Sequence, residues 1–195
     1  MRTGPDSLAP AEGVHWVKLG GGLVLLIGSL FLAARPQPWI FLDWVNLAFH
    51  EAGHIFLLPF GETLHFLGGT LLQLAIPVGA GAHLLLRKES PFGAALCGWW
   101  FGENFLGISV YMADARELKL PLVGGGENDW NHLFYQWGLL GEDAVRRIAG
   151  TTHAAGVVLM LAACAAVLLL ALPATTRRSL AGILSSRTAP GTAAG

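Results

Sequence analysis

The stretch WIFLDWVNLAFHEAGHIFLLPF, residues 39–60, decides the fold class, because it is apolar enough for a membrane helix and still carries the motif H-E-x-x-H. In an α-helix, residues four positions apart lie on one face, so His50 and His54 can bind one zinc ion while Glu51 lies beside it as a base. An acid at mid-bilayer costs about 2.5–3.5 kcal/mol on insertion scales. We therefore expect Glu51 to have a function.

The composition also indicates a membrane protein. The chain is 53% hydrophobic and only 13% charged, whereas a soluble domain carries about 25% charged residues. Its net charge of −1 argues against a nucleic-acid partner, which would require a basic surface. Cys97 and Cys164 are far apart in apolar surroundings, so we expect neither a disulfide framework nor a cysteine metal site. The partner that this composition predicts is the lipid bilayer.

Five apolar stretches have the length of about 17–25 residues that a helix needs to cross a bilayer. They are, approximately, residues 14–34, 38–60, 68–86, 91–113 and 150–172. This pattern predicts an all-α fold, a polytopic integral membrane helical bundle with about five transmembrane helices.

The five stretches define one membrane domain, residues 14–172. We expect an extramembrane segment at 1–13, and a second one at about 114–148 that is glycine-rich and amphipathic. Residues 173–195 are expected to form a disordered tail. The arginines of this tail favour a cytoplasmic C-terminus. Five crossings then place the N-terminus on the opposite side.

Polar residues form a stripe along the helix predicted for 38–60. At 100° per residue, one narrow sector contains Asp43, Asn46, His50 and His54. Lipid cannot satisfy these groups, so the stripe is expected to face the interior of the bundle. Asp43 or Asn46 could hold a histidine N–H in place. Alternatively, Asp43 sits at the membrane edge.

Polar residues also interrupt two other predicted helices. Glu103, within 91–113, is an intramembrane acid. It suits a metal neighbour, a substrate clamp or a proton relay, and equally a hydrogen-bonded acid that fixes helix packing. Gln73, within 68–86, is either interhelical glue or a substrate contact.

A tetrahedral catalytic zinc site needs a third protein ligand. The candidates are Asp114, Glu127, Asp129 and His132. We favour Asp129, because three glycines at 124–126 let the backbone bend sharply and a loop can fold back toward the end of the histidine helix. Asp129 is equally suited to capping a helix that begins there.

The sequence FHEAGH at residues 49–54, within a membrane helix and followed by an acidic glycine-rich segment, resembles the site-2 protease class of intramembrane zinc metalloproteases, particularly its small bacterial relatives. The resemblance covers about residues 38–140. It implies that His50 and His54 bind the metal and that Glu51 is the general base. In that class an Asn-Pro-Asp-Gly motif supplies an aspartate as the third ligand. Here GGGENDW, which begins at Gly124, stands in a loosely similar place, and its aspartate, Asp129, is our proposed counterpart.

The function that the resemblance implies is a zinc metallopeptidase of the bacterial inner membrane, which hydrolyses peptide bonds of membrane-associated polypeptides. Glu51 would take a proton from a zinc-activated water, and Asn104 could donate a hydrogen bond to the oxyanion. Two alternatives remain open: a noncatalytic zinc-binding scaffold or regulatory protein, and a metal transporter. A membrane di-iron desaturase would need more histidine clusters than the one pair found here.

Overall fold

The computed structural model describes residues 13–34, 40–122 and 127–179, and every secondary-structure element within them is helical. The long helices are α1 (Trp16–Ala34), α2 (Phe41–Leu57), α3 (Glu62–Leu86), α4 (Pro91–Ala113) and α6 (Glu142–Leu170). A 3-10 turn, η1 (Leu58–Phe60), separates α2 from α3, and the short helix α5 (Asp129–Gln136) precedes α6. Each of the five predicted apolar stretches corresponds to a long helix, which confirms the all-α fold.

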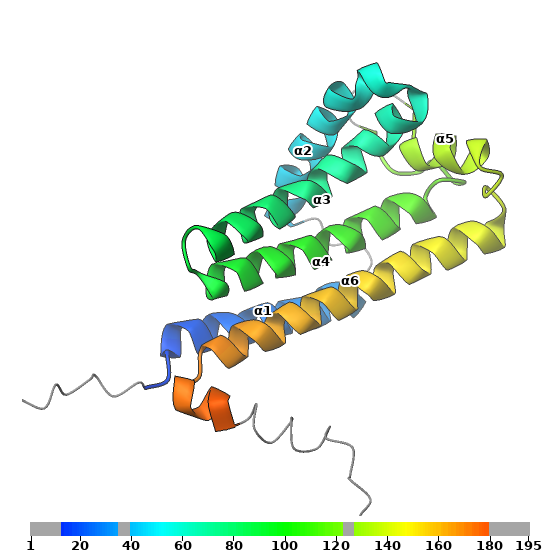
Figure 1. The fold of residues 1–195 in the computed structure, drawn as a ribbon. Coiled ribbons are helices and arrows are strands. Elements are labelled where there is room, and N and C mark those ends of the chain that lie inside the picture. The colour runs from blue at the N-terminus through cyan, green and yellow to red at the C-terminus, as the bar shows by residue number, and fades with distance from the viewer. Residues whose placement is uncertain (1–12, 35–39, 123–126, 180–195) are drawn as a thin grey trace, which may run out of the picture.

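The long helices pack side by side (Figure 1). α4 lies along α6, and α3 lies along α4, while α2 packs against α3 and α1 packs against α6. α5 lies at the end of the bundle where α4 finishes and α6 begins, and it also contacts α3. The buried core at this end consists of Ile108, Met112, Ala115, Trp130, Leu133, Phe134, Val145 and Ala149. α5 therefore holds several helices together through its apolar side chains.

Glycines let α4 and α6 approach backbone to backbone. A Cβ atom added at Gly102 would lie 2.7 Å from the Met160 nitrogen, and one added at Gly156 would lie 2.8 Å from the Gly102 carbonyl oxygen. Small residues at a crossing are typical of helix pairs in membranes, where close packing drives helix association. Trp99 Nε1 also donates to Ser29 Oγ at 2.7 Å, which ties α1 to α4.

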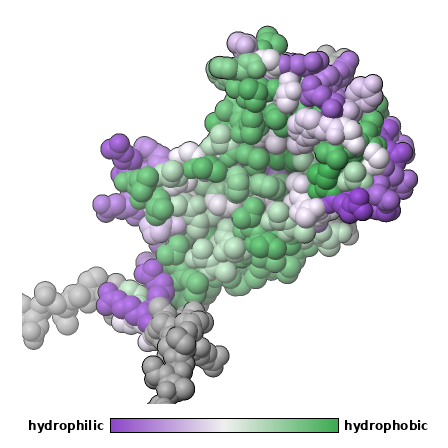
Figure 2. All heavy atoms as spheres, turned by 45° about the vertical axis from the view of Figure 1, so that its right-hand side comes forward, coloured by the Kyte–Doolittle hydropathy of each residue, from purple (hydrophilic) through white to green (hydrophobic). Residues whose placement is uncertain are grey.

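Three helices, α1, α3 and α6, are long and apolar enough to cross a membrane. The other two predicted spans do not meet this criterion. α2 has 17 residues, and α4 carries buried Glu103 and Asn104 among its apolar residues. Figure 2 shows hydrophobic side chains over the middle of the molecule and hydrophilic side chains gathered toward its right and left ends. Such a distribution is expected of a protein that lies in a bilayer.

Helices α1 and α6 run antiparallel and share one end of the bundle. The His15 N–H, just before α1, donates to the Ala171 carbonyl, just after α6, over 2.9 Å. The expectation that the chain enters and leaves the bundle at opposite ends is therefore wrong. The reason lies in α2, which begins beside the inner part of α4 and not beside one of its ends: a Cβ atom on Gly107 would lie 3.8 Å from Asp43 Oδ1, and Asn46 hydrogen-bonds to Glu103. α2 consequently runs along only part of the bundle.

The segments predicted outside the membrane domain are partly described. Residues 174–179 are helical, so the predicted tail 173–195 begins with helical turns and not with irregular chain. Its remainder, 180–195, lies outside the described residues, as do residues 1–12 of the predicted N-terminal segment and the three glycines at 124–126. The predicted extramembrane segment 114–148 contains α5 and the first turns of α6.

Glycines also bring α2 against α3 at the level of the histidine motif. A Cβ atom at Gly53 would lie 2.1 Å from the Gly68 carbonyl oxygen, and one at Gly68 would lie 2.4 Å from the Gly53 carbonyl oxygen. At Gly69, a Cβ atom would lie 2.5 Å from the His50 ring. Any larger residue at these positions would push the helices or the imidazole away. The glycine within H-E-x-x-H is therefore required by the α2–α3 crossing.

Gly53→Ala is expected to destabilise the protein by about 1–3 kcal/mol, the usual cost of forcing an extra carbon into a packed contact. Gly79→Ala is the matched control, because it makes the same change in α3 at a position where a Cβ atom meets nothing within 4 Å. Thermal unfolding of both variants in detergent measures the difference. Equal unfolding midpoints for the two variants would contradict the tight crossing.

Candidate metal centre

Two helices bring three metal-ligating side chains together. His50 and His54 lie one turn apart on α2, and Asp129 begins α5. Asp129 Oδ2 lies 2.8 Å from His50 Nε2 and 3.3 Å from His54 Nε2. The three ligand atoms lie within 4.8 Å of one another, and in the described part of the chain they form the one group of three or more such residues that could hold a metal ion. The structure thus places the favoured third ligand beside both histidines.

The outer nitrogen of each imidazole is held by an acceptor. His50 Nδ1 lies 3.0 Å from Gln73 Oε1, and His54 Nδ1 lies 2.8 Å from the His65 carbonyl oxygen. Both oxygens can only accept, so each Nδ1 carries a proton and donates it. Each Nε2 is then free to turn its lone pair toward Asp129. Metal-binding histidines need this tautomer, and partners of this kind usually fix it.

The arrangement makes hydrogen-bond acceptors face one another. Two imidazole nitrogens and a carboxylate oxygen meet in a space where His50 is 8% and Asp129 is 5% exposed. Lone pairs this close repel unless a cation or an added proton lies between them. A tetrahedral zinc ion with ligands at about 2.0–2.2 Å separates its ligand atoms by about 3.4 Å, so the cluster needs only a small widening to hold one. Two histidines and one carboxylate also leave a fourth position open, as catalytic zinc sites do.

The start of α5 fixes Asp129 in place. Asn128 is the N-cap, since its Oδ1 accepts from the Asn131 N–H at 2.9 Å, and Asn131 Nδ2 donates to the Ala115 carbonyl. The Asp129 N–H donates to Tyr111 Oη at 3.1 Å. Burial opposes ionisation of the Asp129 carboxyl, but positive charge on the two histidines, and the hydrogen bonds that they donate when protonated, lower its pKa below the ordinary value. Asp129 is therefore a carboxylate at neutral pH, the form that binds a metal.

The other three candidates for the third ligand are engaged elsewhere. Asp114 accepts hydrogen bonds from the N–H groups of Lys119 and Leu120 and so shapes the loop after α4. Glu127 Oε2 lies 3.5 Å from His132 Nδ1, so these two side chains pair with each other. None of the three belongs to the histidine cluster in the described residues.

Glu51 lies beside the cluster and is exposed. It follows His50 directly on α2, and its charge acts on both His54 and Tyr111. Across the described ranges it makes neither a hydrogen bond nor an ion pair. The carboxylate is consequently available to water or to a substrate, as a general base must be.

Asn104, the predicted oxyanion donor, is directed elsewhere. Its Nδ2 donates to the Trp100 carbonyl of the same helix at 3.0 Å, and its buried Oδ1 has no partner in the described part of the chain. Tyr111, about 10 Å farther along α4, is the residue of this helix that contacts the cluster, with its ring centroid 5.9 Å from that of His50. The Asn104 amide N–H therefore does not point at the metal ligands.

The N-terminal part of the polar stripe, Asp43 and Asn46, belongs to a separate buried network. Asn46 Nδ2 donates to Glu103 Oε2 at 3.0 Å, and Trp100 Nε1 donates to Asn46 Oδ1 at 2.7 Å. The Asp43 carboxyl lies close enough to that of Glu103 to interact with it electrostatically. Asp43 and Asn46 thus join α2 to α4, and among the described residues neither one supports a histidine, contrary to the expectation. For Glu103, the role that agrees with these contacts is the fixing of helix packing.

Three supporting residues were not assigned to the site from the sequence. Gln73 holds His50, the backbone of His65 holds His54, and Tyr111 holds the backbone of Asp129. Gln73 did carry a signal, since it is a polar residue in an apolar helix. A backbone carbonyl such as that of His65 carries none, because every residue has one.

Gln73→Ala is expected to weaken metal binding by about 10–100-fold, the usual effect of removing a side chain that orients a metal-bound histidine. The three ligands remain, so excess metal should restore full occupancy. Gln136→Ala is the matched control, because Gln136 lies at the exposed end of α5 and its partner is Thr63. Competition with a chromogenic chelator measures both affinities. Equal affinities in the two variants would show that Gln73 does not support His50.

Comparison with protein-family models, with curated proteins and with solved structures finds no match to this chain. The resemblance noted above is therefore carried by its motif alone. The convergence of His50, His54 and Asp129 within a helical bundle stands independently of any relative.

Proposed function

We propose that this chain is a membrane-embedded zinc metallopeptidase that hydrolyses peptide bonds of membrane-associated polypeptides. One observation carries the proposal. The Nε2 atoms of His50 and His54 converge with Asp129 Oδ2, while both Nδ1 atoms are held from outside. Such a set suits a divalent cation, and zinc is the ion that an H-E-x-x-H helix most often binds.

The bilayer is the environment that we infer for the bundle. α1, α3 and α6 are candidate spans, and α4 packs against both α3 and α6, so we infer that it crosses with them. Four crossings return the chain to its starting side, which agrees with the contact between His15 and Ala171. α2 then enters the bilayer only partway. The bacterial inner membrane is the location that the resemblance to small bacterial site-2 proteases implies.

A zinc ion bound at this site would supply a Lewis acid that activates a water molecule and polarises a peptide carbonyl. The residues of the chain transfer the protons and provide the buried environment of the reaction. Glu51 accepts a proton from the attacking water and passes it to the leaving amine nitrogen as the C–N bond breaks. Burial of His50 and Asp129 strengthens the charge effects at the reacting carbonyl.

The unpaired carboxylate of Glu51 favours catalysis over the two alternatives. A noncatalytic zinc-binding scaffold needs the three ligands only, and a metal transporter needs a path of polar groups across the bilayer. Neither requires an acid that stands free beside the ligands. Hydrolysis does, because a water molecule must lose a proton to become a nucleophile.

Purified protein in liposomes, mixed with a panel of membrane-anchored polypeptides, tests the proposal. Cleavage that stops when the metal is chelated and returns when zinc is added supports it. Zinc binding without cleavage of any panel member would favour the scaffold. Uptake of zinc into the vesicles would favour the transporter.

A further inference from the structure

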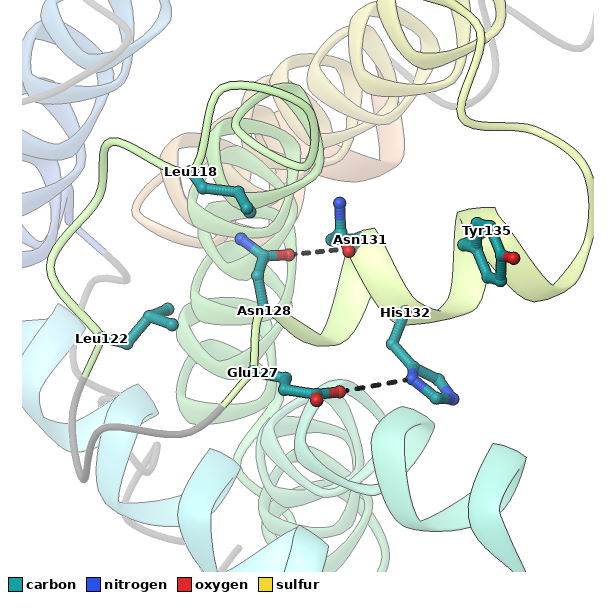
Figure 3. A pocket seen from close by; sticks show the side chains of 7 residues that line it. All are labelled: Leu118, Leu122, Glu127, Asn128, Asn131, His132 and Tyr135. Atoms are coloured by element: carbon teal, nitrogen blue, oxygen red, sulfur yellow. Dashed lines mark hydrogen bonds and ion pairs between the residues drawn. The ribbon is translucent and has the colours of Figure 1, made fainter.

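A pocket of about 410 Å³ opens between the loop after α4 and the first turns of α5 (Figure 3). Its lining residues are Leu118, Leu122, Glu127, Asn128, Asn131, His132 and Tyr135. The size falls within the range of ligand sites, about 300–1,000 Å³. The lining does not include the metal ligands, so the pocket is a feature beside the metal centre and not the centre itself.

Asn128 brings an unused hydrogen-bond donor to this pocket. Its Oδ1 caps α5 by accepting from the Asn131 N–H, whereas its buried Nδ2 has no partner within the described ranges. The residue is 3% exposed, and a buried amide donor without an acceptor destabilises a protein. In Figure 3 the amide nitrogen points away from α5 and toward Leu118. A ligand that places an acceptor there would satisfy it.

The pocket and the metal centre adjoin through the chain itself. Asn128 lines the pocket and Asp129 is the carboxylate of the cluster; consecutive Cα atoms lie about 3.8 Å apart. An extended polypeptide advances about 3.3 Å per residue. A residue bound in the pocket would therefore lie within a few residues of a peptide bond held at the metal centre.

We propose that this pocket is a substrate subsite, which binds an apolar side chain of an extended polypeptide while Asn128 Nδ2 donates to a backbone carbonyl of the same segment. The proposal rests on the proposed function, and it adds which part of the polypeptide substrate the protein recognises. Leu118 and Leu122 supply the apolar wall, and Tyr135 adds an aromatic ring. A polypeptide fits this combination because it repeats a carbonyl acceptor and a side chain at every residue.

The far wall of the pocket is tied to the bundle. His132 Nε2 lies 3.3 Å from Glu62 Oε1 at the start of α3, and His132 Nδ1 lies 3.5 Å from Glu127 Oε2. The His132 ring stacks on that of Phe66, with centroids 3.9 Å apart. These contacts hold the pocket wall in position without occupying Asn128 Nδ2. The site is thus built before any ligand arrives.

Photocrosslinking tests the proposal without requiring cleavage. The probe is an acetylated and amidated Gly-Leu-Leu-Leu-Gly peptide whose central leucine is a photoactivatable analogue, added to Glu51→Gln protein in detergent. Mass spectrometry is expected to map the crosslinks to the wall at Leu118, Leu122 and Tyr135. Asn128→Asp in the same background should raise the peptide concentration that gives half-maximal labelling about tenfold, because the donor is replaced by a second acceptor.

Asn128→Asp keeps the helix cap, since aspartate caps as well as asparagine does, and unchanged metal content will show that α5 is in place. Gln136→Glu is the matched control, because it makes the same amide-to-acid change on α5 outside the pocket. Equal labelling by the two variants, or crosslinks spread over the apolar surface, would overturn the subsite. Specific labelling of the pocket, combined with a wild-type protein that cleaves no member of the polypeptide panel, would support the subsite and refute the peptidase.

Discussion

Asp129→Ala is expected to abolish zinc binding by the purified protein. Two histidines would remain, but a catalytic zinc site needs three protein ligands. Loss of a supporting side chain alone costs about 10–100-fold in affinity, so loss of a ligand is expected to cost more. Elemental mass spectrometry of detergent-purified protein should find about one zinc per chain in the wild type. It should find almost none in Asp129→Ala or His50→Ala.

Alanine variants of the three other candidate ligands are the matched controls. Asp114→Ala, Glu127→Ala and His132→Ala each remove a potential zinc ligand from the same region of the chain without touching the cluster, and all three should retain zinc. Zinc kept by Asp129→Ala but lost in one of these variants would assign the third ligand to that residue. Iron in place of zinc would overturn the choice of metal and leave the ligand set intact, because two histidines and a carboxylate also bind iron.

The positions of the helices follow closely from hydropathy and local signals. The stretch predicted at 91–113 coincides with α4, whose start is marked by Pro91 at the first position and by Ser90, which accepts from the Gly93 N–H. α3 and α6 begin earlier than predicted, at Glu62 and Glu142. Hydropathy detects only the apolar part of a helix, so polar first turns escape it.

The path of α2 could not be predicted in the same way. Residues 38–60 are as long and nearly as apolar as a full span, and nothing local indicates that the helix begins beside the inner part of α4. That placement depends on the buried hydrogen bond between Asn46 and Glu103 and on the nearby Asp43 carboxyl. They are tertiary contacts between residues about sixty positions apart. The expectation that the chain enters and leaves the bundle at opposite ends failed for this reason.

The metal ligands and their supports differ in how far the sequence reveals them. The spacing of His50 and His54 identifies two ligands, because helix geometry alone places them on one face. Asp129 was one of four candidates, and only the packing of α5 selects it. Gln73 reaches His50 because Gly69 leaves room for the imidazole ring. The sequence alone does not show where α2 and α3 cross, so it does not reveal the contact between Gln73 and His50.

Glu51→Gln is expected to lower the rate of peptide cleavage by about 10²–10⁴-fold, the usual contribution of a general base. Glutamine keeps the size of the side chain but cannot take a proton from water. The zinc content should stay unchanged, because Glu51 neither belongs to the ligand cluster nor hydrogen-bonds to any residue that the structure describes. Glu142→Gln, the same change at an exposed position at the start of α6, is the matched control and should cleave at the wild-type rate.

The separate changes in kcat and KM of the Glu51→Gln variant show which role Glu51 has. A fall in kcat with zinc still bound assigns the loss to proton transfer, since the ligands and the fold are then intact. A rise in KM with kcat unchanged would make Glu51 a substrate-binding residue, and its exposed carboxylate would then contact the polypeptide directly. Cleavage at the wild-type rate by zinc-loaded Glu51→Gln would refute the mechanism, because the structure offers no other unpaired acid beside the three ligands in its described residues.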